Sequence, residues 1–183
     1  MSISVKTPLD GNTAGSLKVG DRVMINGVIY TARDAAHKRL VEMMKKGEEL
    51  PLALEGQIIY YVGPCPAKPG QVIGSAGPTT SGRMDAYTPA LLDKGLKGMI
   101  GKGFRSKPVV DSMIKNNAVY FASIGGAGAL LAESIKEAEV VAFPNLGTEA
   151  IYKLTVENFP ATVIIDSRGD NLYVIGKDKY KRG

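Results

Sequence analysis

The pattern of hydrophobic and polar residues has two periods along the chain. A two-residue alternation predicts strands, and a helical spacing of about 3.6 residues predicts helices. Alternation over Ser2–Lys6 predicts a short N-terminal strand. Two further β-prone runs, Arg22–Ile25 and Val28–Ala32, flank Asn26-Gly27. This dipeptide favours a two-residue hairpin turn, because both turn positions need a positive φ angle. We therefore expect a β-hairpin in this region.

A helical spacing follows the second of these runs. Ala36, Leu40 and Met44 fall on one face of a helix. We expect this helix to open with Asp34 as its N-cap and to end near Gly47, because both residue types favour these helix ends.

The middle of the chain alternates strands with helices, and its tail returns to strands. We expect strands at 54–62, 72–75, 97–101, 118–123, 139–143, 150–156, 161–166 and 171–175, the last two joined by a turn. We expect helices at 106–115 and at 126–135, the second with Leu130 and Leu131 facing inward. Before them, one helix either begins near Ser81 and bends at Pro89, or is shorter, with Thr88 as its cap and Pro89 in its first turn. Gly95 follows the end of this helix in both cases. The alternation predicts parallel pairing, and therefore one α/β domain over residues 1–183 with a mixed sheet.

Composition narrows the class of protein. The 183 residues are 44% hydrophobic and 22% charged, as in a soluble globular domain. No apolar run approaches the roughly 18 residues of a membrane span, and no signal-peptide pattern is present, so we expect a cytoplasmic protein without membrane contact. The net charge of +5 is spread out, and no basic cluster alternates with aromatic residues. This pattern disfavours nucleic-acid binding.

The chain has one cysteine, Cys65, and one histidine, His37. A structural zinc site commonly needs four such ligands, and an iron–sulfur cluster needs several thiolates. We therefore expect no metal site within this chain. Any metal that it uses must be held largely by another polypeptide.

Residues 74–85 are the clearest candidate for chemistry. Three glycines in this segment let backbone amides approach a ligand closely, while Thr79, Thr80 and Ser81 offer hydroxyls. Arg83 adds a forked, permanent cation suited to carboxylate or phosphate. The segment therefore predicts an anion-binding loop, with Ser81 as the cap of the next helix.

Three further candidates lie where predicted strands end. Arg33 and Asp34 close a strand and open a helix, a position where ligands collect in open α/β sheets; the alternative is a surface arginine beside an ordinary N-cap. His37, one turn further on, is either a general acid or a hydrogen-bonded surface group. Lys102 lies between two glycines, where it can approach an anion or remain a solvated loop lysine.

Several segments together resemble the β subunit of class I fumarases, a family that includes the β subunit of L(+)-tartrate dehydratase. The resemblance covers nearly the whole chain, and Gly-Pro-Thr-Thr-Ser-x-Arg-Met is its most specific motif. The matching segments are 29–37, 61–64, 77–85, 98–103, 121–129 and 159–163.

This resemblance implies a three-layer β/β/α swivelling-domain architecture and an iron–sulfur-dependent hydro-lyase. Such an enzyme interconverts L-malate and fumarate plus water. A partner α subunit is expected to hold the [4Fe–4S] cluster with three cysteines, and the αβ units are expected to form a homo-oligomer. The chain alone would then be inactive. Two alternatives stay open: a tartrate dehydratase β subunit, and a stand-alone anion-binding or regulatory module.

The family's active-site positions match Arg33, Thr79, Arg83 and Lys102. Arg33, Arg83 and Lys102 are expected to bind the dicarboxylate substrate. Thr79 and Lys102 are expected to act in catalysis, with Thr79 handling the proton alone or through an acid–base residue of the α subunit. Asp34 and His37, which lie in a matched motif, are expected to hold the substrate-contacting residues in position.

Overall fold

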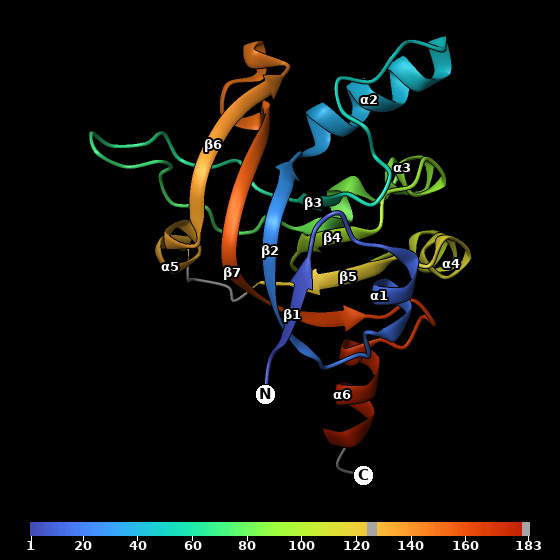
Figure 1. Cartoon of the computed structure of the whole chain (residues 1–183). Helices are drawn as coiled ribbons and strands as arrows, with labels where there is room; N and C mark the ends of the chain where they lie inside the picture. The colour runs from blue at the N-terminus through green and yellow to red at the C-terminus, as the bar shows by residue number, and fades with distance from the viewer. Residues whose placement is uncertain (124–127, 181–183) are drawn as a thin grey trace.

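A computed structural model describes residues 1–123 and 128–180 of the chain (Figure 1). Its strands are β1 (Ile3–Lys6), β2 (Arg22–Thr31), β3 (Ile58–Tyr60), β4 (Gly98–Gly101), β5 (Val119–Ala122), β6 (Ile135–Ala142) and β7 (Ile151–Ile165). Its α-helices are α1 (Gly11–Ser16), α2 (Asp34–Lys46), α3 (Thr88–Asp93), α4 (Lys107–Asn116), α5 (Gly128–Glu133) and α6 (Leu172–Tyr180). Two 3₁₀ helices, η1 (Ser81–Met84) and η2 (Pro144–Glu149), complete the fold.

The strands form one mixed sheet in the order β1-β2-β3-β4-β5-β7-β6. Neighbours from β1 to β5 are parallel, as the alternation of strands and helices predicts. The long strand β7 runs antiparallel to its partners. Its Lys153–Thr162 segment pairs with β2, and its Thr162–Ile165 segment pairs with β5, so the sheet closes into a barrel-like form.

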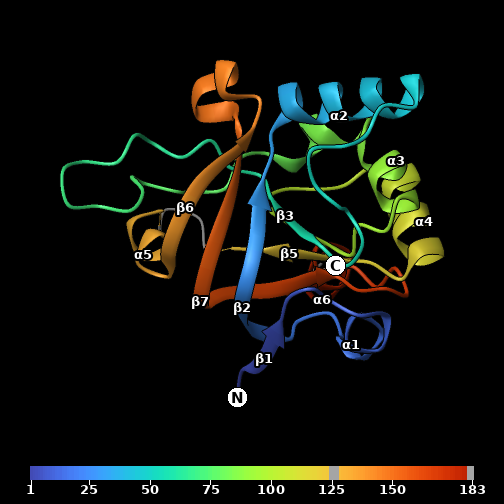
Figure 2. The same ribbon diagram turned by 45° about the horizontal axis from the view of Figure 1, so that its top comes forward.

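Both faces of the central strands are buried. Ile58 and Tyr60 of β3 pack in a core cluster with residues of β1, β2, β5 and β7, whereas Ile59 between them packs in a second cluster beneath the helices. Helices α2, α3 and α4 cover this second face, while β6 and α5 lie on the opposite side (Figures 1 and 2). Burial on both faces explains the unbroken apolar run of β3.

The predicted helices of the central region are confirmed, with small changes at their ends. Arg33, not Asp34, is the N-cap of α2, and Asp34 is its first helical residue. Gly47 ends α2 in the left-handed conformation, at φ 69°. Of the two alternatives after the predicted anion-binding loop, the shorter helix is correct, with Pro89 in its first turn. Its cap is Tyr87, however, and Thr88 is the first helical residue of α3.

The predicted hairpin at Asn26-Gly27 is wrong. Strand β2 runs straight through both residues, and its register with β7 shifts between Ile25 and Gly27, which marks a β-bulge. Gly27 has φ 113°, and a Cβ there would lie 2.5 Å from Thr7 Oγ1. The glycine is therefore needed for a bulge and a close approach, not for a turn.

The C-terminal strand predictions also need correction. The two strands predicted at 150–156 and 161–166 are one strand, β7, and residues 171–175 belong to a bridge and helix α6. The Asp166 carboxylate accepts hydrogen bonds from the backbone N–H groups of Arg168 and Asp170, at 2.9 and 3.3 Å. These bonds close a turn that leads into the helix.

Four smaller differences concern the flanks of the cavity described below. Residues 72–75 form a loop, not a strand. Helix α5 is shorter than predicted, and residues 126–127 lie outside the described residues. Leu131 is buried as expected, whereas Leu130 is exposed. Strand β6 begins at Ile135, earlier than predicted, because it pairs antiparallel with β7.

The α/β class and the mixed sheet of the single domain are confirmed. The named three-layer swivelling-domain architecture remains a prediction of the resemblance. No helix within residues 1–123 and 128–180 has the length and apolar character needed to cross a membrane.

Candidate functional site

The anion-binding loop lies against the carboxyl end of β4. The Thr79 amide donates to the Tyr61 carbonyl at 2.8 Å, which fixes the loop at the end of β3. Thr80 forms a parallel bridge with Lys102, and the Ser81 amide donates to the Lys102 carbonyl at 2.9 Å. The fold therefore brings Thr79 and Arg83 on one segment beside Lys102 on another.

Ser81 fastens this loop to the sheet. Its hydroxyl lies 2.8 Å from the Tyr120 hydroxyl of β5, and its side chain is fully buried. The Cβ that any other residue would place at Gly101 would collide with the Ser81 hydroxyl. The helix-cap role predicted for Ser81 is therefore wrong, since the serine side chain packs on the end of β4.

Arg33 and Asp34 reach the same site from the junction of β2 and α2. Asp34 Oδ2 lies 3.5 Å from Arg83 Nη2, and its Oδ1 lies 3.9 Å from Arg33 Nε. Arg33 Nε also lies 3.1 Å from Glu149 Oε1 at the end of η2. A Cβ at Gly63 would lie 3.2 Å from Arg33 Nη1, so this glycine makes room for the arginine.

The electrostatic character of the site is positive and open. Two cations, Arg33 and Arg83, approach the Asp34 carboxylate, and Glu149 approaches Arg33. Lys102 lies on the neighbouring segment, which bridges to Thr80. The side chain of Arg83 is 55% exposed and that of Arg33 is 23% exposed. Exposed pairs at such distances contribute little to stability, so the pairing of Arg83 with Asp34 is weak.

Two buried polar atoms of the site have unused bonding capacity. Within the described part of the chain, Arg33 Nε and Asp34 Oδ1 are buried and make no well-aligned hydrogen bond. The approach of Glu149 to Arg33 is thus an ion pair with poor hydrogen-bond geometry. Unpaired buried polar atoms are unfavourable, so this arrangement lowers the local stability of the fold.

His37 lies behind Arg33 rather than at the surface. It is fully buried, with its ring edge against Tyr61 at 5.4 Å between centroids. Burial lowers the pKa of His37 to about 4, so the imidazole is neutral near pH 7. Its Nδ1 then donates to the Arg33 carbonyl at 2.8 Å. The surface alternative is wrong, while the supporting role remains a prediction.

Sequence reasoning missed two residues near the site, Glu149 and Arg105. Glu149 follows a loop with no recognisable motif, so only its contact with Arg33 reveals it. Arg105 is buried and pairs with Asp85, the last residue of the predicted anion-binding segment. Its place three residues after Lys102 was the one signal available in the sequence.

The structure offers no metal-binding cluster in the part of the chain that it describes. Within residues 1–123 and 128–180, no three His, Cys, Asp or Glu side chains group as a metal site requires. Cys65 is exposed. The described residues therefore do not fit the ligand set of an iron–sulfur cluster.

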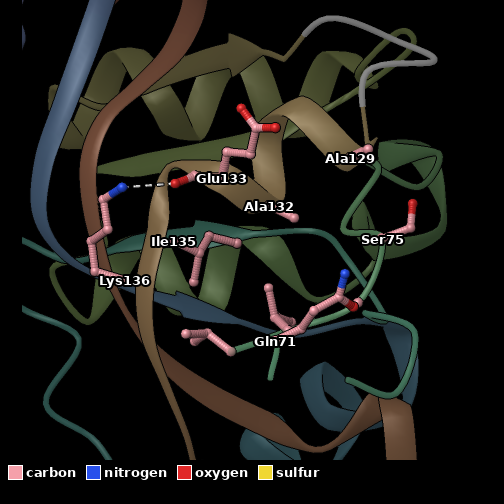
Figure 3. Close-up of a pocket in the computed structure, with 10 residues that line it drawn as sticks. Gln71, Ser75, Ala129, Ala132, Glu133, Ile135 and Lys136 are labelled. Carbon is pink, nitrogen blue, oxygen red and sulfur yellow. Dashed lines mark hydrogen bonds between the residues drawn. The ribbon is translucent and has the colours of Figure 1, made fainter. Parts of the chain in front are cut away.

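Two cavities lie away from the charged cluster. The first has a volume of about 400 Å³ and lies between the loop at 71–75 and the α5–β6 region (Figure 3). Lys136 on its wall donates to the Glu133 carbonyl at 2.8 Å. The second, of about 550 Å³, lies beside Met1 and Arg22. Neither is lined by Arg33, Thr79, Arg83 or Lys102, although Gly74 and Ser75 of the predicted loop line the first.

The fold is that of an α/β domain, and it places the arginines and the lysine predicted to bind an anion near the ends of neighbouring strands. The family model for the fumarase C-terminus matches residues 1–176, and the chain belongs to this family.

Its relatives include class I fumarate hydratases and a tartrate dehydratase β subunit. Fumarate hydratase 2 of Leishmania major is 42% identical over 177 residues, which are 94% of this chain and 31% of that protein. The aerobic class I fumarate hydratase of Escherichia coli K12 is 45% identical over 157 residues, 85% of this chain and 29% of that protein. The putative L(+)-tartrate dehydratase subunit beta of Methanocaldococcus jannaschii is 41% identical over 173 residues, 91% and 89% of the two chains. The chain thus spans about a third of the fumarate hydratases that it matches.

Proposed function

We propose that this chain is the β part of a hydro-lyase that interconverts L-malate and fumarate plus water. The observation that carries this proposal is the approach of Arg33 and Arg83 to Asp34, beside the segment of Lys102, in a member of the fumarase C-terminus family. Related fumarate hydratases are about three times longer. In this proposal an α subunit supplies the remaining part of the site, and the αβ units assemble into a homo-oligomer.

The charges of the cluster suit a dicarboxylate. The near approach of Arg33 Nε to Glu149 leaves the two terminal nitrogens of Arg33 for one carboxylate. Arg83 and Lys102, held on adjacent segments, bind the other carboxylate. Removal of a proton next to a carboxylate builds negative charge on that group, and fixed cations lower the free energy of this state.

Thr79 has a place in proton transfer that depends on a second group. Its backbone is held by Tyr61, and its side chain is half-buried beside the cation cluster. A threonine hydroxyl is a weak base without help. We therefore assign Thr79 the role of orienting the substrate proton through a hydrogen bond, with the acid–base residue supplied by the α subunit.

The [4Fe–4S] cluster belongs to the α subunit in this proposal. The described residues of this chain do not fit its ligand set. What this chain contributes is charge, orientation and one wall of the site. An open surface, rather than a closed pocket, is what a site shared between two polypeptides requires.

A tartrate dehydratase β subunit is the second candidate. One observation favours it: the relative named as such is a chain of nearly the same length, 89% of which is covered. Tartrate is also a dicarboxylate with a hydroxyl group, so the same cations suit it. A substrate panel separates the two, since turnover of tartrate above that of malate would contradict the fumarase proposal.

Anaerobic reconstitution tests the proposal. The purified chain alone is expected to show no hydratase activity, and addition of the cluster-loaded α subunit is expected to produce it. Turnover by the chain alone at the rate of the reconstituted pair would contradict the proposal that the site is shared between two polypeptides. Failure of the pair to react with any dicarboxylate would favour a stand-alone anion-binding module.

A further inference from the structure

Arg105 carries a buried charge directly beneath the candidate site. Its side chain is 0% exposed, and its Nε donates to Asp85 Oδ1 at 2.7 Å. Asp85 Oδ2 in turn accepts the backbone N–H of Ser106 at 2.6 Å. A buried charge without a partner would be strongly unfavourable, so this pair holds the two segments together.

The remaining contacts of Arg105 reach three more elements. Nη2 donates to the Thr88 hydroxyl of α3 at 2.9 Å and to the Tyr61 hydroxyl at 3.3 Å. The guanidinium carbon lies 5.2 Å from the centre of the Tyr61 ring and 5.0 Å from that of Tyr120. Five donors in a fixed plane and a flat face make these contacts possible at once, which no lysine can reproduce.

These contacts continue to the two segments that carry the site residues. The Tyr120 hydroxyl donates to the Gly103 carbonyl at 3.0 Å, and Ser81 Oγ lies 2.8 Å from the same hydroxyl. The Ser81 amide bonds to the Lys102 carbonyl. Arg105 thus closes a ring of contacts around the anion-binding loop and the end of β4.

We propose that Arg105 is a positioning residue that fixes the separation between Arg83 and Lys102. Asp85, its ion-pair partner, lies two residues after Arg83, and Arg105 lies three residues after Lys102. None of its hydrogen bonds or ion pairs within the described residues goes to Arg83 or Lys102 themselves. The inference rests on the proposed function, because the separation matters if both cations bind one substrate.

The first test is hydrogen exchange of the chain itself, which needs no activity. In Arg105→Lys the charge remains but the planar contacts to Tyr61 and Tyr120 are lost. The Ser81 amide, bonded to Lys102, is expected to exchange at least tenfold faster, while the Ile100 amide within β4 stays protected. Equal loss of protection at both amides would indicate general unfolding, and an unchanged Ser81 amide would overturn the proposal.

The second test is a double-mutant cycle on the reconstituted enzyme. Arg105→Lys is expected to lower kcat/KM on the order of 10²-fold, because a small displacement of binding groups has such an effect. Combined with Arg83→Ala or Lys102→Ala, its effect should shrink at least fivefold, since the positioned group is already absent. Arg33 lies on another segment. The fold-losses in kcat/KM caused by Arg105→Lys and Arg33→Ala should therefore multiply in the double variant. Multiplicative effects in all three pairs would overturn the proposal.

Arg168→Lys is the matched control. Arg168 also pairs with a buried carboxylate, Asp166, at 2.7 Å, but in the turn after β7. Arg168→Lys should leave kcat/KM within about twofold of the wild-type value. If wild-type reconstitution yields no activity, the proposed function fails, while faster exchange at Ser81 would still establish that Arg105 fixes the loop.

Discussion

His37 makes the stability of the fold depend on pH in a defined window. The imidazole is buried behind Arg33, and its pKa is lowered from 6.5 to about 4 by burial. In the unfolded chain the same group takes up a proton near its ordinary pKa. Between pH 4 and 6.5 the unfolded state therefore binds more protons than the folded state.

The sign and size of the effect follow from proton linkage. Because the unfolded state binds the extra proton, the free energy of unfolding falls as pH falls through this window and levels off above about pH 7. For the two pKa values given, stability at pH 5 is lower than at pH 7.5 by about 2 kcal/mol from this residue alone. His37 is the one histidine in the chain, so no other imidazole contributes.

Urea unfolding of the purified chain at pH 5 and pH 7.5 measures this difference. His37→Asn keeps an N–H near the Nδ1 position, where it can donate to the Arg33 carbonyl, but it does not titrate. The difference between the two pH values should therefore shrink by about 2 kcal/mol in the variant, whatever its absolute stability. An equal pH dependence in both proteins would show that the His37 imidazole is protonated in the folded state or is solvated.

Three substitutions at the site give further expected outcomes in the reconstituted enzyme. Arg83→Ala removes a forked cation and should lower kcat/KM by roughly 2–4 kcal/mol in transition-state terms, and a loss below about tenfold would place Arg83 away from the substrate. Thr79→Val changes the volume little and should abolish turnover without changing the melting temperature, so appreciable turnover would contradict its role. Glu149→Gln removes the charge that faces Arg33 and should raise KM several-fold with kcat unchanged in steady-state assays, whereas an unchanged KM would separate Glu149 from substrate binding.

The parts of the fold that depend on local sequence could be predicted. Helix α2 follows from its apolar spacing and from Gly47, and the burial of β3 follows from its apolar run. The prediction of a hairpin at Asn26-Gly27 was wrong because the conformation of this dipeptide depends on pairing with β7, which lies far along the chain. Where a distant strand pairs with both sides of such a dipeptide, a bulge forms in place of a turn.

The candidate site likewise combines residues that the local sequence reveals with residues that only distant contacts reveal. Arg33, Arg83 and Lys102 could be singled out because they lie at predicted strand ends or in a recognisable motif. In the structure Arg33 and Arg83 approach Asp34, and Lys102 bridges to Thr80. Glu149 could not be found in this way, because its contact with Arg33 joins two loops that are remote in sequence. Arg105 is similar, since only its burial and its pairing distinguish it from a surface arginine.

In the proposed function, this chain supplies the dicarboxylate-binding half of a site completed by an α subunit. Anaerobic reconstitution with that subunit tests this division directly, with malate and fumarate turnover compared for the wild-type chain and for Lys102→Ala. We expect no turnover by either polypeptide alone, turnover by the wild-type pair, and a rise in KM with a fall in kcat for the variant pair. Turnover by the α subunit alone, or an unchanged rate with Lys102→Ala, would contradict it.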